Sequence, residues 1–210
     1  MAKLLLMRHA KSEWNVLGFW TGLTDIGLSP EGELEAIESA ETLQSIRIDR
    51  TYTSNLIRAK DTLEIIKGEL DLHHILTIAH PALNERDYGI YTGKNKWEIK
   101  ERIGEEEFQK LRRSWDYPIP NGETLHDVYN RVVPYYESVI LEELRNNKTV
   151  LVVSHGNTLR ALVKYIEYLS ENEIMKLEIG TGEVLVYDIT PDGSVLSKKI
   201  LAENKNKAQI

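Results

Sequence analysis

The sequence predicts an α/β protein built around a mostly parallel sheet. Short apolar runs rich in Leu, Val and Ile alternate with longer stretches of helical period, which is the order expected when helices connect neighbouring parallel strands. Neither a linker nor a repeat of about 20–50 residues interrupts this order, so residues 1–210 are expected to form a single domain. A chain of 210 residues is long enough to bury a hydrophobic core without disulfides or metals.

The first half of the chain is expected to contain three strands and two helices. Ser29 is predicted to cap the first helix, with Pro30 in its first turn, because a Ser side chain satisfies a free helix N–H and Pro lacks one. Ser54 is predicted to cap the second helix in the same way. The expected strands are residues 3–7, 51–53 and 75–78, and the expected apolar faces are Leu34, Ile37 and Leu43 in the first helix and Leu56, Ala59, Leu63, Ile66 and Leu70 in the second.

The second half begins with a polar and aromatic region, residues 81–122, in which a helix is expected around residues 97–113. This region is interpreted as a lid-like insertion. Thr124 and Asp127 form a capping pair for a helix that runs to about Arg145, and Pro134 is predicted to kink it because proline has no N–H. The remaining strands are expected at residues 149–153, 184–188 and 195–201, and the polar tail, residues 202–210, is expected to be mobile.

The composition excludes several classes of partner. A formal net charge of −7, from 26 Lys and Arg against 33 Asp and Glu, gives no general attraction to nucleic acids or to anionic membranes. The absence of cysteine excludes disulfides, a Cys nucleophile and thiolate metal sites, and no spacing of His and carboxylate residues predicts a metal. Because every apolar run is far shorter than the roughly 20 residues of a membrane span, a cytoplasmic protein is expected.

Two predicted strands run directly into polar clusters that contain histidine. Arg8 and His9 follow the first strand, and His155, Gly156 and Asn157 follow the strand at residues 149–153. A single histidine in such a place is commonly only the cap of a strand. Two of them at the carboxyl ends of parallel neighbours would lie side by side, at the edge of the sheet where α/β proteins bind ligands. The backbone N–H groups at the start of the following helix would complete an anion pocket.

Arg58 lies in the first turn of the helix after Ser54 and could bring a guanidinium to the same pocket, although read alone it is equally well an exposed arginine. Several fixed donors around one point are what a phosphoryl group requires. Attack by a neutral imidazole nitrogen would give a phosphohistidine and split phosphoryl transfer into two steps without a metal. The residues alone do not decide which histidine is the nucleophile.

An ordered series of motifs resembles those of the histidine phosphatase superfamily and, within it, the bisphosphoglycerate-dependent phosphoglycerate mutases. The motifs are LLLMRHAKSEWN at residues 4–15, LNERDYG at 83–89, NK at 95–96, LRRSWD at 111–116, NGETL at 121–125 and HGNTLRALV at 155–163. The resemblance implies a phosphoglycerate mutase-like three-layer α/β/α sandwich. It also implies phosphoglycerates as small-molecule substrates, 2,3-bisphosphoglycerate as the priming cofactor, no metal, and a homodimer or homotetramer.

The resemblance also implies roles for individual residues. His9 becomes phosphorylated, while Arg8, Arg58 and His155 hold the transferring phosphoryl group. Glu85 acts as the general acid and base, a task suited to a carboxyl group, although NERD is otherwise simply a charged loop. The residues expected to bind substrate are Ser12, Asn15, Thr21, Gly22, Tyr88, Lys96, Arg112, Arg113, Gly156 and Asn157.

Three functions are compared. A mutase must hold a highly anionic bisphosphate and exclude water, and Lys96, Arg112 and Arg113 would supply the extra positive charge for this, although adjacent arginines are otherwise typical of a solvated helix face. A simple phosphatase of the same superfamily has no need of that second cluster. A phospho-ligand sensor needs neither a nucleophile nor a proton donor. Where the family usually has Gly and Gln after the first His, this chain has Ala10 and Lys11, which is expected to place an extra cation beside the nucleophile.

Overall fold

A computed structural model describes residues 1–204, and within them six strands form one mixed sheet. The strand order is β3-β2-β4-β1-β5-β6, in which the first four strands are parallel and the last two pair antiparallel. Every predicted strand is present, with ends that differ by one or two residues. The strands are β1 (Ala2–Arg8), β2 (Arg50–Thr53), β3 (Thr77–Ala79), β4 (Thr149–Ser154), β5 (Val184–Ile189) and β6 (Val195–Ile200).

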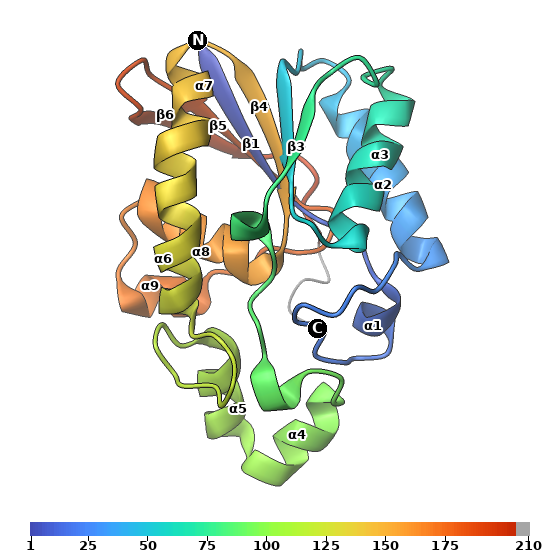
Figure 1. Cartoon of the computed structure of the whole chain (residues 1–210), viewed down its shortest axis with the longest axis vertical. Helices are drawn as coiled ribbons and strands as arrows, with labels where there is room; N and C mark the ends of the chain where they lie inside the picture. Colours follow the sequence, from blue (N-terminus) through green and yellow to red (C-terminus); the bar gives the residue numbers. More distant parts are fainter. Residues whose placement is uncertain (205–210) are drawn as a thin grey trace.

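Helices cover both faces of the sheet, and the three layers are seen in Figure 1. In β1, Leu4 and Leu6 pack into one core while Leu5 and Met7 pack into the other, because successive side chains of a strand point to opposite faces. The expected α/β/α sandwich is therefore confirmed. The first face carries α6 (Leu125–Tyr135), α7 (Leu141–Arg145), α8 (Gly156–Ile166) and α9 (Glu171–Lys176), and the second carries α2 (Pro30–Leu43) and α3 (Ile57–Glu69).

The helix that begins after Thr124 follows the sequence pattern closely. Thr124 and Asp127 form a capping box, as predicted. Helical structure continues to Arg145, but a turn of π-helix, η3 (Tyr136–Ile140), follows Pro134 and separates α6 from α7. Because proline cannot donate a backbone hydrogen bond, the α-helical ladder lacks one bond at Pro134, next to this turn. The kink expected at Pro134 stays a prediction.

Two predictions about the first helices are wrong. Leu34 is 63% exposed and Ile37 is partly exposed, so of the expected apolar face only Leu43 is buried, together with Gly32, Ala36, Ser39 and Ala40. A Cβ on Gly32 would lie 1.9 Å from the Lys11 carbonyl oxygen, so only glycine lets the chain pass this close to α2. Ser54 does not cap α3, because the N-cap residue is Leu56. The Ser54 hydroxyl instead accepts the Leu56 N–H and contacts His155.

Residues 81–122 form an irregular segment beyond the carboxyl ends of the parallel strands, at the bottom of Figure 1. The single helix expected at 97–113 is two helices, because Gly104 adopts a φ of +83°, which interrupts the helix and favours glycine. Trp20, Tyr88 and Phe108 belong to a small hydrophobic cluster under this segment. Its elements are η1 (Pro81–Leu83), η2 (Gly89–Tyr91), α4 (Lys96–Ile103) and α5 (Glu105–Arg113), and α1 (Glu13–Val16) lies nearby.

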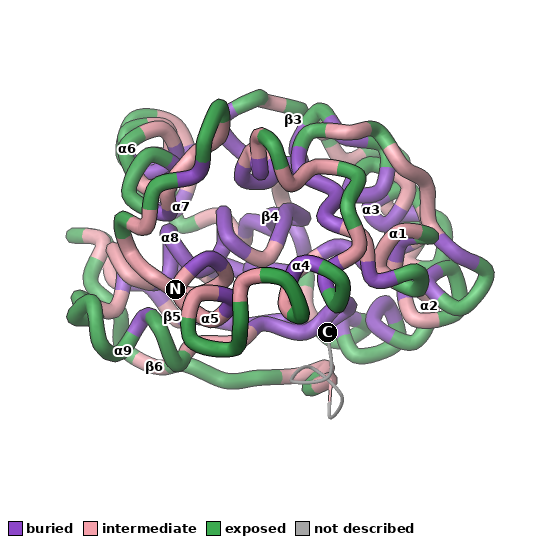
Figure 2. Tube along the Cα trace, turned by 90° about the horizontal axis from the view of Figure 1, so that it is seen from below, coloured by how far each residue is buried: buried purple, intermediate pink, exposed green. Residues whose placement is uncertain are grey.

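Burial follows the layers. The central strands are buried, whereas β6 at the rim of the sheet is largely exposed (Figure 2). None of the helices formed by residues 1–204 is long and apolar enough to cross a membrane. Of the predicted tail, Asn204 donates hydrogen bonds to Glu35 and to Thr181, and residues 205–210 lie outside the described part of the chain.

Candidate active site

The two histidines that follow β1 and β4 lie side by side. Arg8 and Ser154 are partners in the parallel register, so the next residue of each strand emerges at the same edge of the sheet. The ring centroids of His9 and His155 are 4.9 Å apart, and both side chains are buried. The His9 N–H donates to the Ser154 carbonyl at 2.8 Å, which fixes the two loops together. The predicted juxtaposition of the imidazoles is confirmed.

Hydrogen bonding assigns the proton of the His9 ring. Nδ1 lies 2.7 Å from the Ala10 carbonyl oxygen, and because a carbonyl only accepts, Nδ1 must carry a hydrogen. Burial, and then the positive charges of Arg58 and Arg8, hold the pKa of His9 well below its ordinary value of 6.5. The ring is therefore neutral near pH 7, and Nε2 keeps the lone pair that a nucleophile needs.

His155 is held from the opposite side. Its Nε2 lies 2.7 Å from the Ser54 hydroxyl oxygen, and its buried Nδ1 has no hydrogen-bond partner among the described residues. Burial, followed by the charge of Arg58, lowers the pKa of His155 well below 6.5, so this ring is neutral as well. His155 therefore carries an unpaired ring nitrogen, in a ring 4.9 Å from that of the candidate nucleophile.

Two arginines complete the innermost part of the site. Arg8 donates to the Ile179 carbonyl at 2.8 Å, and its buried Nε has no partner among the described residues. A Cβ on Gly156 would lie 3.5 Å from that Nε, so the side chain of Arg8 lies against the start of α8. Arg58 is buried rather than exposed and donates to the carbonyls of Gly22 and Thr24, each at 2.9 Å. Burial lowers the pKa of Arg58 to about 10, so it stays charged at pH 7.

Glu85 is a buried carboxylate rather than a surface charge, with 8% of its area exposed. Its Oε1 accepts the Arg86 N–H at 2.7 Å and the side-chain amide of Asn157 at 3.3 Å. The same amide donates to the Tyr88 hydroxyl at 2.7 Å. Residues far apart in the sequence are thus connected around one carboxylate, which lines the same small pocket as Arg8.

That pocket has a volume of about 70 Å³ and a strongly cationic lining. Burial lowers the pKa of Lys96 to about 7 and that of Arg113 to about 9, because each charge is taken out of water among other cations. Arg113 also forms an ion pair with Glu178. Arg112 and Arg113 therefore face the pocket instead of forming a solvated helix face. The lining consists of Arg8, Trp20, Glu85, Tyr88, Lys96, Arg112, Arg113, Gly156, Asn157, Arg160, Glu178 and Ile179.

The buried ammonium of Lys96 is expected to reduce the stability of the unliganded protein. Lys96→Met should raise the free energy of unfolding at pH 7 by about 1 kcal/mol or more, which is about 2–4 °C in Tm for a chain of this size. An unfolded Lys keeps its proton up to about pH 10, whereas folded Lys96 loses it near pH 7, so wild-type stability rises with pH between these values. Thermal unfolding of both proteins at pH 6 to 9 should show the difference between them shrinking as pH rises. A difference in Tm between the two proteins that does not change with pH would contradict the proposal that Lys96 is buried and charged.

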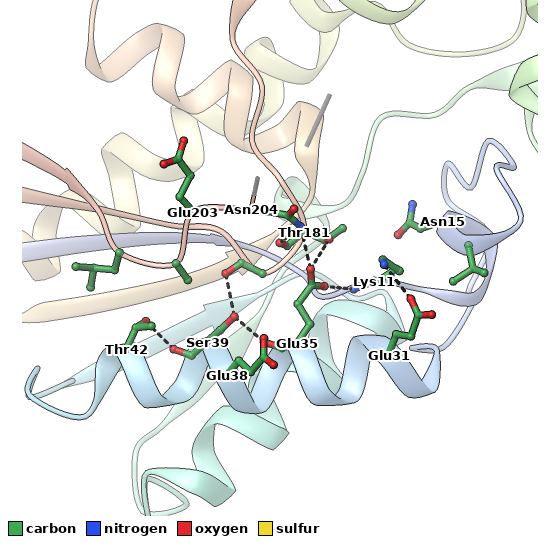
Figure 3. A pocket seen from close by; sticks show the side chains of 14 residues that line it. Lys11, Asn15, Glu31, Glu35, Glu38, Ser39, Thr42, Thr181, Glu203 and Asn204 are labelled. Atoms are coloured by element: carbon green, nitrogen blue, oxygen red, sulfur yellow. Dashed lines mark hydrogen bonds and ion pairs between the residues drawn. The ribbon is translucent and has the colours of Figure 1, made fainter. Parts of the chain in front are cut away.

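Four predicted substrate-binding residues lie outside this pocket. Ser12 and Asn15 form the capping box of α1, and Thr21 is buried in the loop before Gly22, whose carbonyl holds Arg58. Asn15 instead lines a second hollow of about 720 Å³ between α2 and the chain after β6 (Figure 3). Lys11 belongs to this hollow too. It pairs with Glu31 at 2.9 Å, so the expectation of an extra cation beside His9 is wrong.

Sequence reasoning missed two arginines, Arg160 in the pocket lining and Arg131, that hold other residues of the site in place. Arg160 donates to the Asn157 side chain at 2.9 Å and to the Arg113 carbonyl at 3.0 Å. Arg131 donates to the carbonyls of Ala82 and Glu85, at 2.8 and 3.0 Å. The spacing of Asn157 and Arg160, three residues apart on one helix, was a signal that they share a face. The carbonyls that Arg131 contacts lie 49 and 46 residues away in the sequence, so no local pattern indicates these contacts.

Comparisons with known proteins agree with this geometry. The family model of the histidine phosphatase superfamily (branch 1) matches residues 4–200. A 2,3-bisphosphoglycerate-dependent phosphoglycerate mutase of Rhodopseudomonas palustris (strain BisB18) is 43% identical, over 95% of this chain and 98% of the relative. A protein of the same name from Chelativorans sp. (strain BNC1) is 46% identical, over 94% of this chain and 97% of the relative.

Solved structures share the fold at lower identity. YhfR of Bacillus stearothermophilus superposes with a TM-score of 0.81 at 24% identity, covering 93% of this chain and 94% of its own. A mycobacterial glucosyl-3-phosphoglycerate phosphatase complexed with VO3 gives a TM-score of 0.83 at 21% identity, covering 96% of this chain and 99% of its own. At these identities the solved structures support the fold of this chain and no further conclusion.

Proposed function

This chain belongs to the histidine phosphatase superfamily, and on that premise we propose that it is a 2,3-bisphosphoglycerate-dependent phosphoglycerate mutase. It interconverts 3-phosphoglycerate and 2-phosphoglycerate through a phosphohistidine, as a step of glycolysis and gluconeogenesis. One observation carries the proposal: a neutral, buried His9 directly follows Arg8, which lines a pocket together with Lys96, Arg112 and Arg113. Relatives more than 40% identical over most of both chains bear the mutase name.

The chemistry follows from the roles that the geometry supports. Nε2 of His9 attacks phosphorus, the bond from phosphorus to the substrate oxygen breaks, and its electron pair stays on that oxygen. Glu85 then supplies the proton that this oxygen needs and later removes the proton from the hydroxyl group that attacks the phosphohistidine. Arg8, Arg58, His155 and the Gly156 N–H hold the three phosphoryl oxygens, whose charge grows during transfer.

The residues present fit 2,3-bisphosphoglycerate, a small and highly anionic molecule. Arg8 Nε and His155 Nδ1 are buried polar atoms without partners among residues 1–204, which is the arrangement expected of donors reserved for a phosphoryl group. Lys96, Arg112 and Arg113 supply charge for a second anionic group. When bound, 2,3-bisphosphoglycerate provides the phosphoryl group that primes His9. Tyr88 and Asn157 line the same pocket. Ser12, Asn15, Thr21 and Gly22 lie outside it, and we propose them as substrate-binding residues on the family resemblance alone.

The segment of residues 81–122 contributes Glu85, Lys96, Arg112 and Arg113 to the lining of the pocket. We infer that this segment acts as a lid that excludes water during transfer. Exclusion of water separates a mutase from a phosphatase, because a hydrated phosphohistidine is hydrolysed. We further place the enzyme in the cytoplasm, as a homodimer or homotetramer acting on free phosphoglycerates, as a single domain without a metal.

The proposed reaction is tested by phosphorus NMR. The protein is incubated with 3-phosphoglycerate, EDTA and a trace of 2,3-bisphosphoglycerate, and 2-phosphoglycerate and inorganic phosphate are followed together. We expect 2-phosphoglycerate to reach equilibrium with little free phosphate, and only after priming. Accumulation of phosphate alone would identify a phosphatase. Absence of both products and of acid-labile phosphate on the protein would identify a binding protein.

A further inference from the structure

Ser54 has no role in the mechanism so far, and yet it contacts the active site. It precedes α3 and is fully buried. Its hydroxyl oxygen accepts the Leu56 N–H at 3.1 Å and lies 2.7 Å from Nε2 of His155. Because His155 is also fully buried, water cannot replace either contact. Whether each polar atom of Ser54 and His155 has a hydrogen-bond partner is therefore decided by the protein atoms around the pair.

Two tautomers of His155 are conceivable, and they differ in how many polar atoms stay unsatisfied. If Nε2 carried the hydrogen, the Ser54 oxygen would accept both contacts. The Ser54 hydrogen would then need another buried acceptor, and the Nδ1 lone pair would lack a donor. If Nδ1 carries the hydrogen, the Ser54 hydroxyl donates to Nε2 and every contact of the pair is complementary. Of the polar atoms of this pair, the Nδ1–H alone then lacks a partner among the described residues.

We propose that Ser54 is a positioning residue that holds His155 in the Nδ1–H tautomer, so that this N–H donates to an oxygen of the transferring phosphoryl group. The inference rests on the phosphoryl transfer proposed above. It explains why Nδ1, in a ring 4.9 Å from that of His9, has no partner in the part of the chain that the structure describes. The opposite tautomer would direct a lone pair at a phosphoryl oxygen and repel it, so the choice of tautomer decides whether His155 aids the transfer.

The tautomer is measured directly by NMR of protein labelled with ¹⁵N in histidine, without any turnover. The shifts of the two ring nitrogens report which one carries hydrogen, and His155→Gln identifies the signals. We expect protonated Nδ1 and unprotonated Nε2 for His155 in the wild type. Ser54→Ala should mix the tautomers, and Ser54→Thr, which keeps the hydroxyl, should preserve the wild-type pattern. A hydrogen on Nε2 in the wild type would overturn the inference, even if the variants failed to fold.

Kinetics provide the second arm. In Ser54→Ala, phosphorylation of His9 by 2,3-bisphosphoglycerate should slow by about tenfold to a hundredfold, while the Kd of 2,3-bisphosphoglycerate changes by less than about threefold. Ser54→Thr should remain within about threefold of the wild type. Equal rates in Ser54→Ala and the wild type would contradict the positioning role. If the tautomer is as proposed but the wild type forms no 2-phosphoglycerate, the proposed function fails and the assignment of the tautomer stands.

Discussion

Replacing His9 with alanine is expected to abolish formation of 2-phosphoglycerate, lowering kcat by at least about 10⁴-fold. The loss follows because His9 is the only residue of the proposed mechanism that forms a bond to phosphorus. Residues that only bind the phosphoryl group cannot replace a nucleophile. His155 does not replace it, since its Nε2 is already engaged by Ser54. The measurement is phosphorus NMR of the isomerisation, together with detection of acid-labile phosphate on the protein after incubation with 2,3-bisphosphoglycerate.

A matched histidine separates loss of the nucleophile from a general effect of substitution. His73 lies on the surface near Glu64, with 64% of its side chain exposed, so His73→Ala should retain wild-type activity and phosphorylation. The binding function of the pocket should survive in His9→Ala, because the arginines are unchanged. Stoichiometric phosphorylation of His9→Ala, or its isomerisation of 3-phosphoglycerate at the wild-type rate, would show that another residue is the nucleophile.

The fold could be predicted because its signals are local. Apolar runs marked all six strands, and capping residues marked the helix starts at Ser29 and Thr124. Predictions failed where a distant segment decided the outcome. Small residues make up most of the buried face of α2, and at Gly32 the Lys11 backbone passes too close for a Cβ, which no pattern within the helix indicates. In the same way Ser54 was read as a cap, although its partner His155 is 101 residues away.

The site shows the same division. Placing His9 beside His155 requires β1 and β4 to be parallel neighbours; the alternation of elements suggests parallel strands, but only the structure shows that these two are adjacent. The supporting arginines were missed because a buried arginine resembles a surface charge until its carbonyl partners are known. Arg131 donates to the backbone at Ala82 and Glu85, and Arg160 to the backbone at Arg113. These bonds position the loops that carry the reacting groups, and they exist only in the folded chain.

Glu85→Gln is expected to lower kcat for 3-phosphoglycerate by about 10²–10⁴-fold while leaving KM nearly unchanged. Glutamine keeps the shape and can still meet Asn157 and the Arg86 N–H, but it cannot exchange a proton with a substrate oxygen. The sugar-acid oxygen is a poor leaving group without a proton. Both halves of the reaction therefore slow, and steady-state kinetics by phosphorus NMR measure the loss. Glu101→Gln, an exposed carboxylate on α4, is the matched control and should have no effect.

The role of Glu85 as a proton donor is separated from a role in binding by changing the leaving group. Departure of p-nitrophenolate needs no proton, so Glu85→Gln should still acquire phosphate on His9 from p-nitrophenyl phosphate at close to the wild-type rate. With 2,3-bisphosphoglycerate as donor, the same variant should be phosphorylated slowly. Equal losses with both donors would mean that Glu85 acts by shaping the pocket or by its charge. A loss confined to 2,3-bisphosphoglycerate would assign the proton transfer to this carboxyl group, because only that donor requires a proton on its departing oxygen.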